Sequence, residues 1–545
     1  MRPSLLLLLL LPLIAGACST SEKETKLVLL STADVHGYVF PWDYYNDQPE
    51  ERYSLLKAAT IIDSVRSQNP HTLALDAGDW LQGNPFAEYF ARVDTTLAYP
   101  FLSVVDALDF SAVVVGNHEF NFGLEHLHFR MSQSDTPFLA ANALHSETGQ
   151  AAYTPWLIKE VDGYKIGILG LTTPGSAIWD RPRLEGRLRF EDGVESARRY
   201  VPEMLENGAE VIILVIHSGF EGSTSYTSDV LGEEHFGRAI ADEVPGIHAM
   251  VTSHTHRLID DLIYLSEANP QGVAVTQPGR WASHIGYTEL LLSRDATGTV
   301  QVAYGKNIAL PVEGAKPHTA LYEQFLGEHE LVRSHMQKAI ATTDSVWSSS
   351  DARLADRAIT DLIQYVQRRA TGADLSGSAI FHTDAAFTDG IINRGSLARV
   401  YPFENTLFKL RISGAVLREY LEFSARYYET YNGDGTALPQ PAGHIPGFNF
   451  DVVYGANYQI NLRKPAGERI ENLRVNGRPV RDSDSFTIAL NSYRAVGGGD
   501  YHMIAGAEVV GVIDTSVRLL VEQYLLEKGH INPQDVARKY WQIVY

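Results

Sequence analysis

Short apolar runs alternate with amphipathic stretches through the first half of the chain, and most of the runs end in polar residues. The apolar runs have the length of buried β-strands, and the amphipathic stretches have the spacing of helices. This alternation predicts an α/β layered domain. The predicted strands are 26–31, 71–75, 112–115, 165–169, 211–216, 249–252 and 273–276, and the predicted helices include 55–66, 85–92 and 101–108.

The pattern changes after residue 316. Apolar residues at helical spacing, from Leu321 to Ile340, predict a helix over 317–344. It would either pack on the first domain or link two domains, and we favour the link. Further helices are predicted over 354–369 and from Ala415, with strands at 407–412 and 487–490. A chain of 545 residues exceeds one core. We therefore divide it into 1–17, 18–25, 26–316, 317–344 and 345–545.

The N-terminus has the layout of a signal peptide over residues 1–17. An apolar run over 5–14 is too short to span a bilayer, and Ala15-Gly16-Ala17 precedes Cys18. This is the pattern of a bacterial lipoprotein, in which Cys18 is lipidated and 18–25 is a polar tether. Cleavage by ordinary signal peptidase is the alternative. We expect an exported protein, periplasmic or at the cell surface, that contacts a membrane through its lipid anchor.

Composition narrows the classes of partner. The net charge is −21, which argues against binding of polymeric nucleic acid because such proteins need a basic surface. A small anionic substrate would need compensation from metals or arginine within a cleft. Cys18 is the only cysteine, so no disulfide forms within the chain. No protein partner is implied.

Residues able to bind metal follow five of the apolar runs. Any one of them alone could be an ordinary polar turn, but five strands that each end in such a residue predict a metal centre. Mixed nitrogen and oxygen ligands without thiolate favour Zn, Mn, Fe or Co. So many ligands suit two divalent ions about 4 Å apart that activate a bridging hydroxide for attack on phosphorus. The candidates are Asp34, His36, Asp79, Asn117, His217, His254 and His256.

The motifs Asp-x-His-Gly, Gly-Asp, Gly-Asn-His-Glu, His-Ser-Gly and His-x-His occur in this order, starting at Asp34. They resemble those of the calcineurin-like metallophosphoesterases and, more closely, the 5′-nucleotidase family. The resemblance implies an αββα sandwich over 26–316 with a C-terminal α/β substrate-binding domain. It also implies two metals that share one carboxylate. Asp34, His36, Asp79 and His256 would hold one metal, and Asp79, Asn117, His217 and His254 the other.

The resemblance makes His118 a catalytic residue that contacts phosphate and is not a ligand. In 5′-nucleotidases an Asp three residues later orients this His, but the residue here is Asn121. An amide can hold the ring but brings no charge. We therefore expect His118 to be less basic than in a His–Asp pair.

The C-terminal half contains Pro-x-x-Asn-Thr-Leu, Phe-Asn-Phe-Asp-Val, Asn-Tyr-Gln-Ile and Asn-x-Tyr-Arg-Ala. These resemble the bifunctional 2′,3′-cyclic-nucleotide 2′-phosphodiesterase/3′-nucleotidase branch, in which two aromatics sandwich the base. The matching positions are Phe448 and Tyr493. The Gly-Gly-Gly-x-Arg motif of 5′-nucleotidases is missing from the matching region, 382–387.

We therefore expect hydrolysis of 2′,3′-cyclic ribonucleotides to 3′-nucleotides, and of these to nucleoside and phosphate. The enzymatic alternative is a 5′-nucleotidase or UDP-sugar hydrolase, against which Asn121 and the missing motif argue. The non-enzymatic alternative is a surface nucleotide-binding or adhesion protein. The complete set of candidate metal ligands argues against this non-enzymatic alternative.

Overall fold

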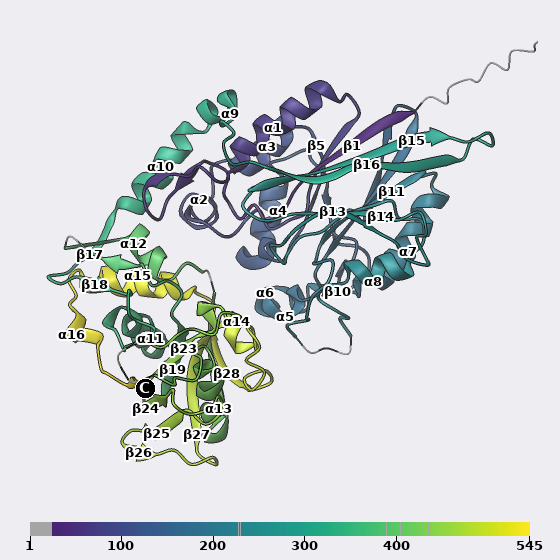
Figure 1. Cartoon of the computed structure of the whole chain (residues 1–545). Helices are drawn as coiled ribbons and strands as arrows, with labels where there is room; N and C mark the ends of the chain where they lie inside the picture. Colours follow the sequence, from purple (N-terminus) through teal and green to yellow (C-terminus); the bar gives the residue numbers. More distant parts are fainter. Residues whose placement is uncertain are drawn as a thin grey trace, which may run out of the picture.

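The computed structural model describes residues 24–226, 228, 230–388, 390–403, 405–433, 435 and 437–545. Cys18, the predicted signal peptide and most of the predicted tether lie outside these residues. Within the described part of the chain, every helix is too short or too polar to cross a membrane. Figure 1 shows two lobes, with the N-terminal half in one and the C-terminal part in the other.

The N-terminal lobe contains two six-stranded sheets, both of mixed direction. The first has the order β16 (Val300–Pro311), β15 (His284–Arg294), β1 (Thr25–Thr32), β4 (Thr72–Asp76), β5 (Phe110–Val114) and β6 (Phe138–Leu139). The second has the order β13 (Leu258–Tyr264), β14 (Val273–Pro278), β12 (Ala249–Val251), β11 (Val211–His217), β9 (Tyr164–Thr172) and β8 (Trp156–Val161).

These sheets pack face to face and are covered by helices outside. All seven residues of β11 are buried, because both faces of the sheet are covered. Alternate residues of β1 and β4, such as Leu27 and Leu73, meet Ile166 and Ile213 of the other sheet in one core. Helices α1 (Leu55–Gln68) and α3 (Pro100–Ala107) lie over the first sheet, and α7 (Gly193–Glu206) and α8 (Gly237–Glu243) over the second. The predicted αββα sandwich is confirmed.

The helix predicted over 85–92 is α2 (Pro85–Glu88) followed by a π-helical turn at Tyr89–Val93. The helix predicted over 317–344 is two helices, α9 (Thr319–Gln324) and α10 (Leu326–Gln337). Beyond Lys338 the chain is extended, because β17 (Ala339–Thr342) pairs with β21 (Ile391–Asn393) of the second lobe. The apolar stripe packs into the core of the first lobe from Leu321 to Met336, and its last residue, Ile340, packs in the core of the second. The segment therefore both packs on the first lobe and leads into the second.

The C-terminal lobe is built on a five-stranded sheet and a smaller four-stranded one. The predicted helix 354–369 begins four residues later, as α11 (Ala358–Thr371), because the residues before it form turns. Helix α13 (Gly414–Ala425) is capped by Ser413, and α15 (Val517–Lys528) by Ser516. The larger sheet has the order β23 (Asp451–Tyr454), β19 (Leu375–Ala379), β27 (Ser485–Asn491), β22 (Leu407–Ser413) and β28 (Glu508–Ile513).

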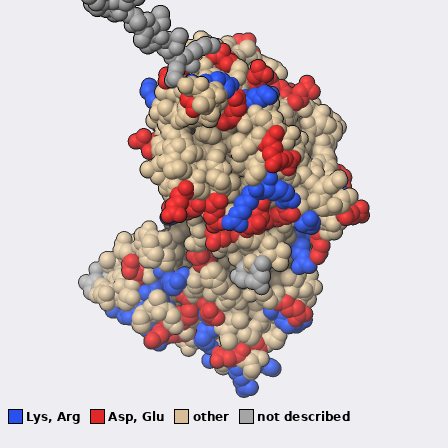
Figure 2. All heavy atoms as spheres, turned by 90° about the vertical axis from the view of Figure 1, so that its right-hand side faces the viewer, with Lys and Arg blue, Asp and Glu red and all other residues tan. Residues whose placement is uncertain are grey.

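The two lobes meet through ion pairs and enclose a cavity of about 720 Å³. Arg183 of α6 (Arg181–Leu184) pairs with Asp514 at 2.5 Å, and Arg518 pairs with Glu88. Both lobes line the cavity. On the face shown in Figure 2, acidic and basic side chains are interspersed over the two lobes.

Candidate metal centre and substrate cleft

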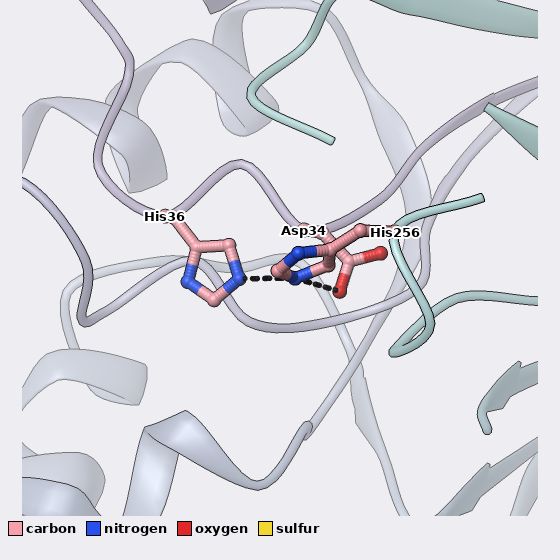
Figure 3. Close-up of side chains that lie close together, drawn as sticks. All are labelled: Asp34, His36 and His256. Atoms are coloured by element: carbon pink, nitrogen blue, oxygen red, sulfur yellow. Dashed lines mark hydrogen bonds and ion pairs between the residues drawn. The ribbon is translucent and has the colours of Figure 1, made fainter. Parts of the chain in front are cut away.

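Three of the predicted ligands converge at the carboxyl ends of β1 and β12. His36 Nε2 lies 3.0 Å from His256 Nε2, which lies 3.5 Å from Asp34 Oδ1. Figure 3 shows the two rings and the carboxylate directed toward one another. His36 Nδ1 lies 2.7 Å from the carbonyl oxygen of Gln82. Nδ1 therefore carries the proton and donates it, which leaves the Nε2 lone pair free to bind a metal.

The other predicted ligands form a second cluster beside the first. His217 Nε2 lies 3.0 Å from Asn117 Oδ1 and 3.1 Å from Asp79 Oδ2. His217 Nδ1 lies 2.7 Å from the carbonyl oxygen of Ala77, so Nε2 is again the free ligand atom. Ligand atoms of His254, Asp79 and His217 all lie within 4.8 Å of one another.

Asp79 lies between the two clusters. Its Oδ2 atom is 3.1 Å from His217 Nε2 in one cluster and 3.8 Å from His36 Nε2 in the other. Its Oδ1 atom accepts the backbone N–H of His118. The structure thus brings all seven predicted ligands together and places Asp79 where a shared carboxylate would have to be.

The backbone of this region is strained. Five of the seven predicted ligands are non-glycine residues with positive φ, a conformation that persists only where the surrounding structure enforces it. Gly116 is needed for a different reason, since a Cβ there would lie 2.3 Å from Asp79 Oδ1. The five ligands with positive φ are Asp34 (50°), His36 (48°), Asp79 (60°), His254 (68°) and His256 (57°).

Glu119 connects two of the loops that carry predicted ligands. Its buried carboxylate accepts the backbone N–H groups of Asp79, Trp80 and Leu81 after β4, and of Gly116 after β5. A carboxylate with four amide donors is a rigid connection between neighbouring loops. The sequence analysis assigned Glu119 no role.

The residues present fit divalent cations. Asp34 and Asp79 are buried, and in the described part of the chain neither is paired with a lysine or arginine. Burial and the charge of Asp79 raise the pKa of Asp34. Burial lowers the pKa of His36 to about 4 and also lowers the pKa of His256. Neutral imidazoles beside buried carboxylates are a donor set for metals such as those predicted.

His118 lies outside the ligand clusters and forms a chain of polar contacts. His118 Nδ1 is 2.7 Å from Asn121 Oδ1, and Asn121 Nδ2 donates to Asp180 Oδ2 at 2.9 Å. Arg183 in turn donates to Asp180 Oδ1 at 3.1 Å. The amide of Asn121 therefore connects His118 to a buried carboxylate that the sequence analysis missed. Burial opposes the charged form of His118, but Asp79, Asn121 and Asp180 together raise its pKa.

A carboxylate also supports His254. Glu234 Oε1 lies 2.9 Å from His254 Nε2, which leaves Nδ1 for the metal centre. Trp179 stacks on the same ring with 5.6 Å between centroids. Glu234, His235 and His254 are also close enough together to form a third candidate metal cluster. However, His254 Nε2 cannot bind a metal while it donates a hydrogen bond to Glu234. We therefore interpret Glu234 as a residue that orients His254.

Phe448 and Tyr493, the two residues predicted to bind the base, line the cavity from the C-terminal lobe. Their side chains are 44% and 42% exposed. Arg494 is buried, contacts both Asp451 oxygens at 2.9 Å and donates to the carbonyl of Phe448 at 3.0 Å. This ion pair connects the two segments that carry the rings, while the rings themselves stay open to the cavity.

Comparison with known proteins agrees with this geometry. Residues 27–258 match the calcineurin-like phosphoesterase family, and residues 339–506 match the C-terminal domain of 5′-nucleotidases. The chain is 30% identical to a 2′,3′-cyclic-nucleotide 2′-phosphodiesterase/3′-nucleotidase of Salmonella typhimurium, over 89% of this chain and 84% of that protein. The chain belongs to the 5′-nucleotidase family. This family member is a metal-dependent phosphoester hydrolase with the two-domain nucleotidase fold.

Two further proteins are similar to this 5′-nucleotidase family member. It is 28% identical to the trifunctional nucleotide phosphoesterase protein YfkN of Bacillus subtilis, over 99% of this chain and 40% of that longer protein. A Staphylococcus aureus protein solved in complex with α-ketoglutarate is 26% identical, with a TM-score of 0.79, over 95% of this chain and all of the other.

Asp180, Glu234 and Glu119 are among the polar residues of this site that were not predicted from the sequence. Glu119 had a local signal, since it directly follows His118 in the motif. Asp180 lies between the short helices α5 (Ser176–Trp179) and α6, and Glu234 lies in a loop, so neither follows a strand and nothing in the sequence relates them to His118 or His254. Only the packing of distant loops brings them to the site.

Proposed function

We propose that this enzyme hydrolyses 2′,3′-cyclic ribonucleotides to 3′-nucleotides and then hydrolyses the 3′-nucleotides to nucleoside and phosphate. The observation that carries the proposal is one cavity with two clusters of candidate ligands, and Asp79 between them, at one end and two exposed rings, Phe448 and Tyr493, at the other. The activity named for the Salmonella typhimurium relative supports it.

In the proposed reaction, water adds to phosphorus and the bond from phosphorus to the 2′-oxygen breaks. The 2′-oxygen takes up a proton, and the phosphate stays on the 3′-oxygen. In the second reaction the bond to the 3′-oxygen breaks in the same way. Two divalent cations, when bound by the clusters, would lower the pKa of water and neutralise charge on the phosphoryl oxygens.

The residues of the chain would do the remaining work. His118, 36% exposed at the cavity, would hold a proton for the leaving oxygen. Asn121 and Asp180 would fix the orientation of its ring. Phe448 and Tyr493 would stack on the base, which is worth about 1–3 kcal/mol per base.

A comparison of four substrates tests the proposal. Phosphate release from 2′,3′-cAMP, 3′-AMP, 5′-AMP and UDP-glucose should be measured with the metal-loaded enzyme, and cyclic substrate should also be followed to 3′-AMP. We expect 2′,3′-cAMP and 3′-AMP to have the highest kcat/KM. A preference for 5′-AMP or UDP-glucose would establish the alternative, a 5′-nucleotidase or UDP-sugar hydrolase. Turnover of none of the four would favour a nucleotide-binding or adhesion protein.

We also propose export and lipid attachment at Cys18, on the sequence pattern of residues 5–18. Cys18→Ala should move the mature protein from the membrane fraction to the periplasmic or culture fluid and abolish labelling by a radioactive fatty acid. Equal labelling of both proteins would contradict lipidation and favour simple secretion.

A further inference from the structure

Arg280 lies at the edge of the first ligand cluster. It occupies the turn between β14 and β15, lines the cavity and places Nη1 3.3 Å from His256 Nδ1. No role for Arg280 was predicted from the sequence, because it lies outside every metal-binding motif.

The turn that carries Arg280 is strained and fixed to the metal centre. Trp281 and Ala282 both have positive φ, 63° and 53°, and the backbone N–H of Trp281 donates to the carbonyl oxygen of Asp34 at 2.7 Å. Two successive non-glycine residues in this conformation mark a turn whose shape is imposed by its surroundings. The position of Arg280 relative to Asp34 is therefore set by the backbone.

The side chain of Arg280 is also supported. Its guanidinium lies over the ring of Trp281, 4.0 Å from the centroid. Trp281 in turn contacts Tyr38 and Tyr53, at centroid distances of 4.8 and 5.2 Å. Stacking of this kind holds a guanidinium plane in place and leaves its N–H groups available at the edge.

Arg280 differs from the other arginines that line the cavity. Arg183 pairs with Asp180 and Asp514, and Arg399 lies 3.5 Å from Asp384. Within the described residues, no ion pair joins Arg280 to a carboxylate. Arg280 is thus an exposed cation at the cavity, supported by its neighbours but without a carboxylate partner among the described residues, in a chain of net charge −21.

The tautomer of His256 decides whether Arg280 can donate a hydrogen bond to it. His256 Nε2 faces His36 and Asp34, so it is the atom that would bind a metal. A neutral imidazole that ligates through Nε2 carries its proton on Nδ1 and donates there. Arginine also only donates. In the metal-binding form of His256, its hydrogen bond with Arg280 is therefore lost, and the N–H groups of the guanidinium are available to another acceptor at the cavity.

We propose that Arg280 binds a non-bridging oxygen of the phosphoryl group of the substrate and of the phosphate product. This inference rests on the proposed phosphoester chemistry and adds a binding residue to it. The guanidinium would supply, from the catalytic domain, a charge-assisted hydrogen bond beside the metals.

Direct binding of inorganic phosphate to metal-loaded protein tests the role without turnover. Isothermal titration should compare wild type with Arg280→Gln, Arg280→Lys and the control Arg257→Gln. Arg257 is exposed, adjoins His256 and does not line the cavity, so its loss removes the same charge. We expect the Kd to rise roughly tenfold to a hundredfold in Arg280→Gln, as for loss of a hydrogen bond to a charged group. Arg280→Lys should lose less, and Arg257→Gln should bind like wild type.

The metal content of each variant, measured by mass spectrometry, separates loss of a phosphate contact from an effect of Arg280 on His256 as a metal ligand. The proposal requires equal metal in Arg280→Gln and wild type. A fall in metal content that accounts for the weaker phosphate binding, or an unchanged Kd, would overturn it. An equal rise in Kd for Arg257→Gln would also overturn it, by showing an effect of net charge alone. If the substrate comparison instead favours 5′-AMP, the proposed function fails while the phosphate result for Arg280 stands.

Discussion

The two ends of the cavity are built in opposite ways. At the metal end, five candidate ligands sit on strained backbone, and ring nitrogens are oriented by carbonyl or carboxylate partners such as Gln82 and Glu234. At the other end, Phe448 and Tyr493 are nearly half exposed, and the segments that carry them are joined by the Arg494–Asp451 pair. Chemistry needs atoms at fixed positions, whereas stacking on a flat base needs only exposed area.

This contrast predicts that changes at the metal end reduce turnover and changes at the aromatic end weaken binding. The largest effect is expected for Asp79→Asn. Loss of the shared carboxylate should reduce both metal content and kcat by more than the roughly 10–100-fold cost of losing an outer partner of a metal ligand. Metal analysis and assays on 2′,3′-cAMP and 3′-AMP measure it. Retained turnover with full metal would contradict a bridging Asp79.

Glu234→Gln comes next. The amide can still accept a hydrogen bond from His254, but it removes the charge that makes the ring a better donor to metal. We expect metal affinity to fall by up to roughly 10–100-fold, measured by titration of metal-free protein. Glu233→Gln removes the same charge from the preceding residue and should bind metal like wild type. Equal affinity for both variants would mean that Glu234 does not support His254.

Phe448→Ala and Tyr493→Ala should raise KM with little change in kcat, because the rings act on binding alone. Loss of one stacked ring costs about 1–3 kcal/mol. Phe129→Ala is the control, since Phe129 is also 44% exposed and lies away from the cavity. A fall in kcat at unchanged KM would contradict base stacking and remove the contrast between the two ends.

The smallest effect is expected for Asp180→Asn. Asp180 raises the pKa of His118, so its neutralisation should lower that pKa. If protonated His118 is needed, activity is present below its pKa and lost above it. The alkaline limb of the pH–kcat profile should therefore move to lower pH. Glu185→Gln, a charge change on the exposed surface nearby, should leave the profile in place. Identical limbs for wild type and Asp180→Asn would mean that Asp180 does not act on His118.

The surroundings of His118 show which part of the site could be predicted from the sequence. The motif identified His118 and Asn121, and their contact at 2.7 Å agrees with it. We expected no negative charge beside His118 because Asn121 is neutral, but Asn121 Nδ2 donates to the carboxylate of Asp180, which supplies one on the far side of the amide. The linker segment is similar: residues 321–336 of the apolar stripe are helical as predicted, but Ile340 lies in β17, because this part of the chain pairs with β21.

The sequence by itself predicted seven strands of the N-terminal lobe and all seven candidate ligands, because strand periodicity is local and parallel strands deliver their carboxyl ends to one edge. The αββα architecture was expected from the resemblance of the motifs to a known family, and the strands β8, β13, β15 and β16 were not predicted. Tertiary structure alone decided that Asp79 lies between the clusters, that Glu234 and Asp180 support His254 and His118, and that Arg280 faces His256. These contacts join loops far apart in the chain. Their geometry comes from the packing of two sheets against each other, for which a single sequence carries no local signal.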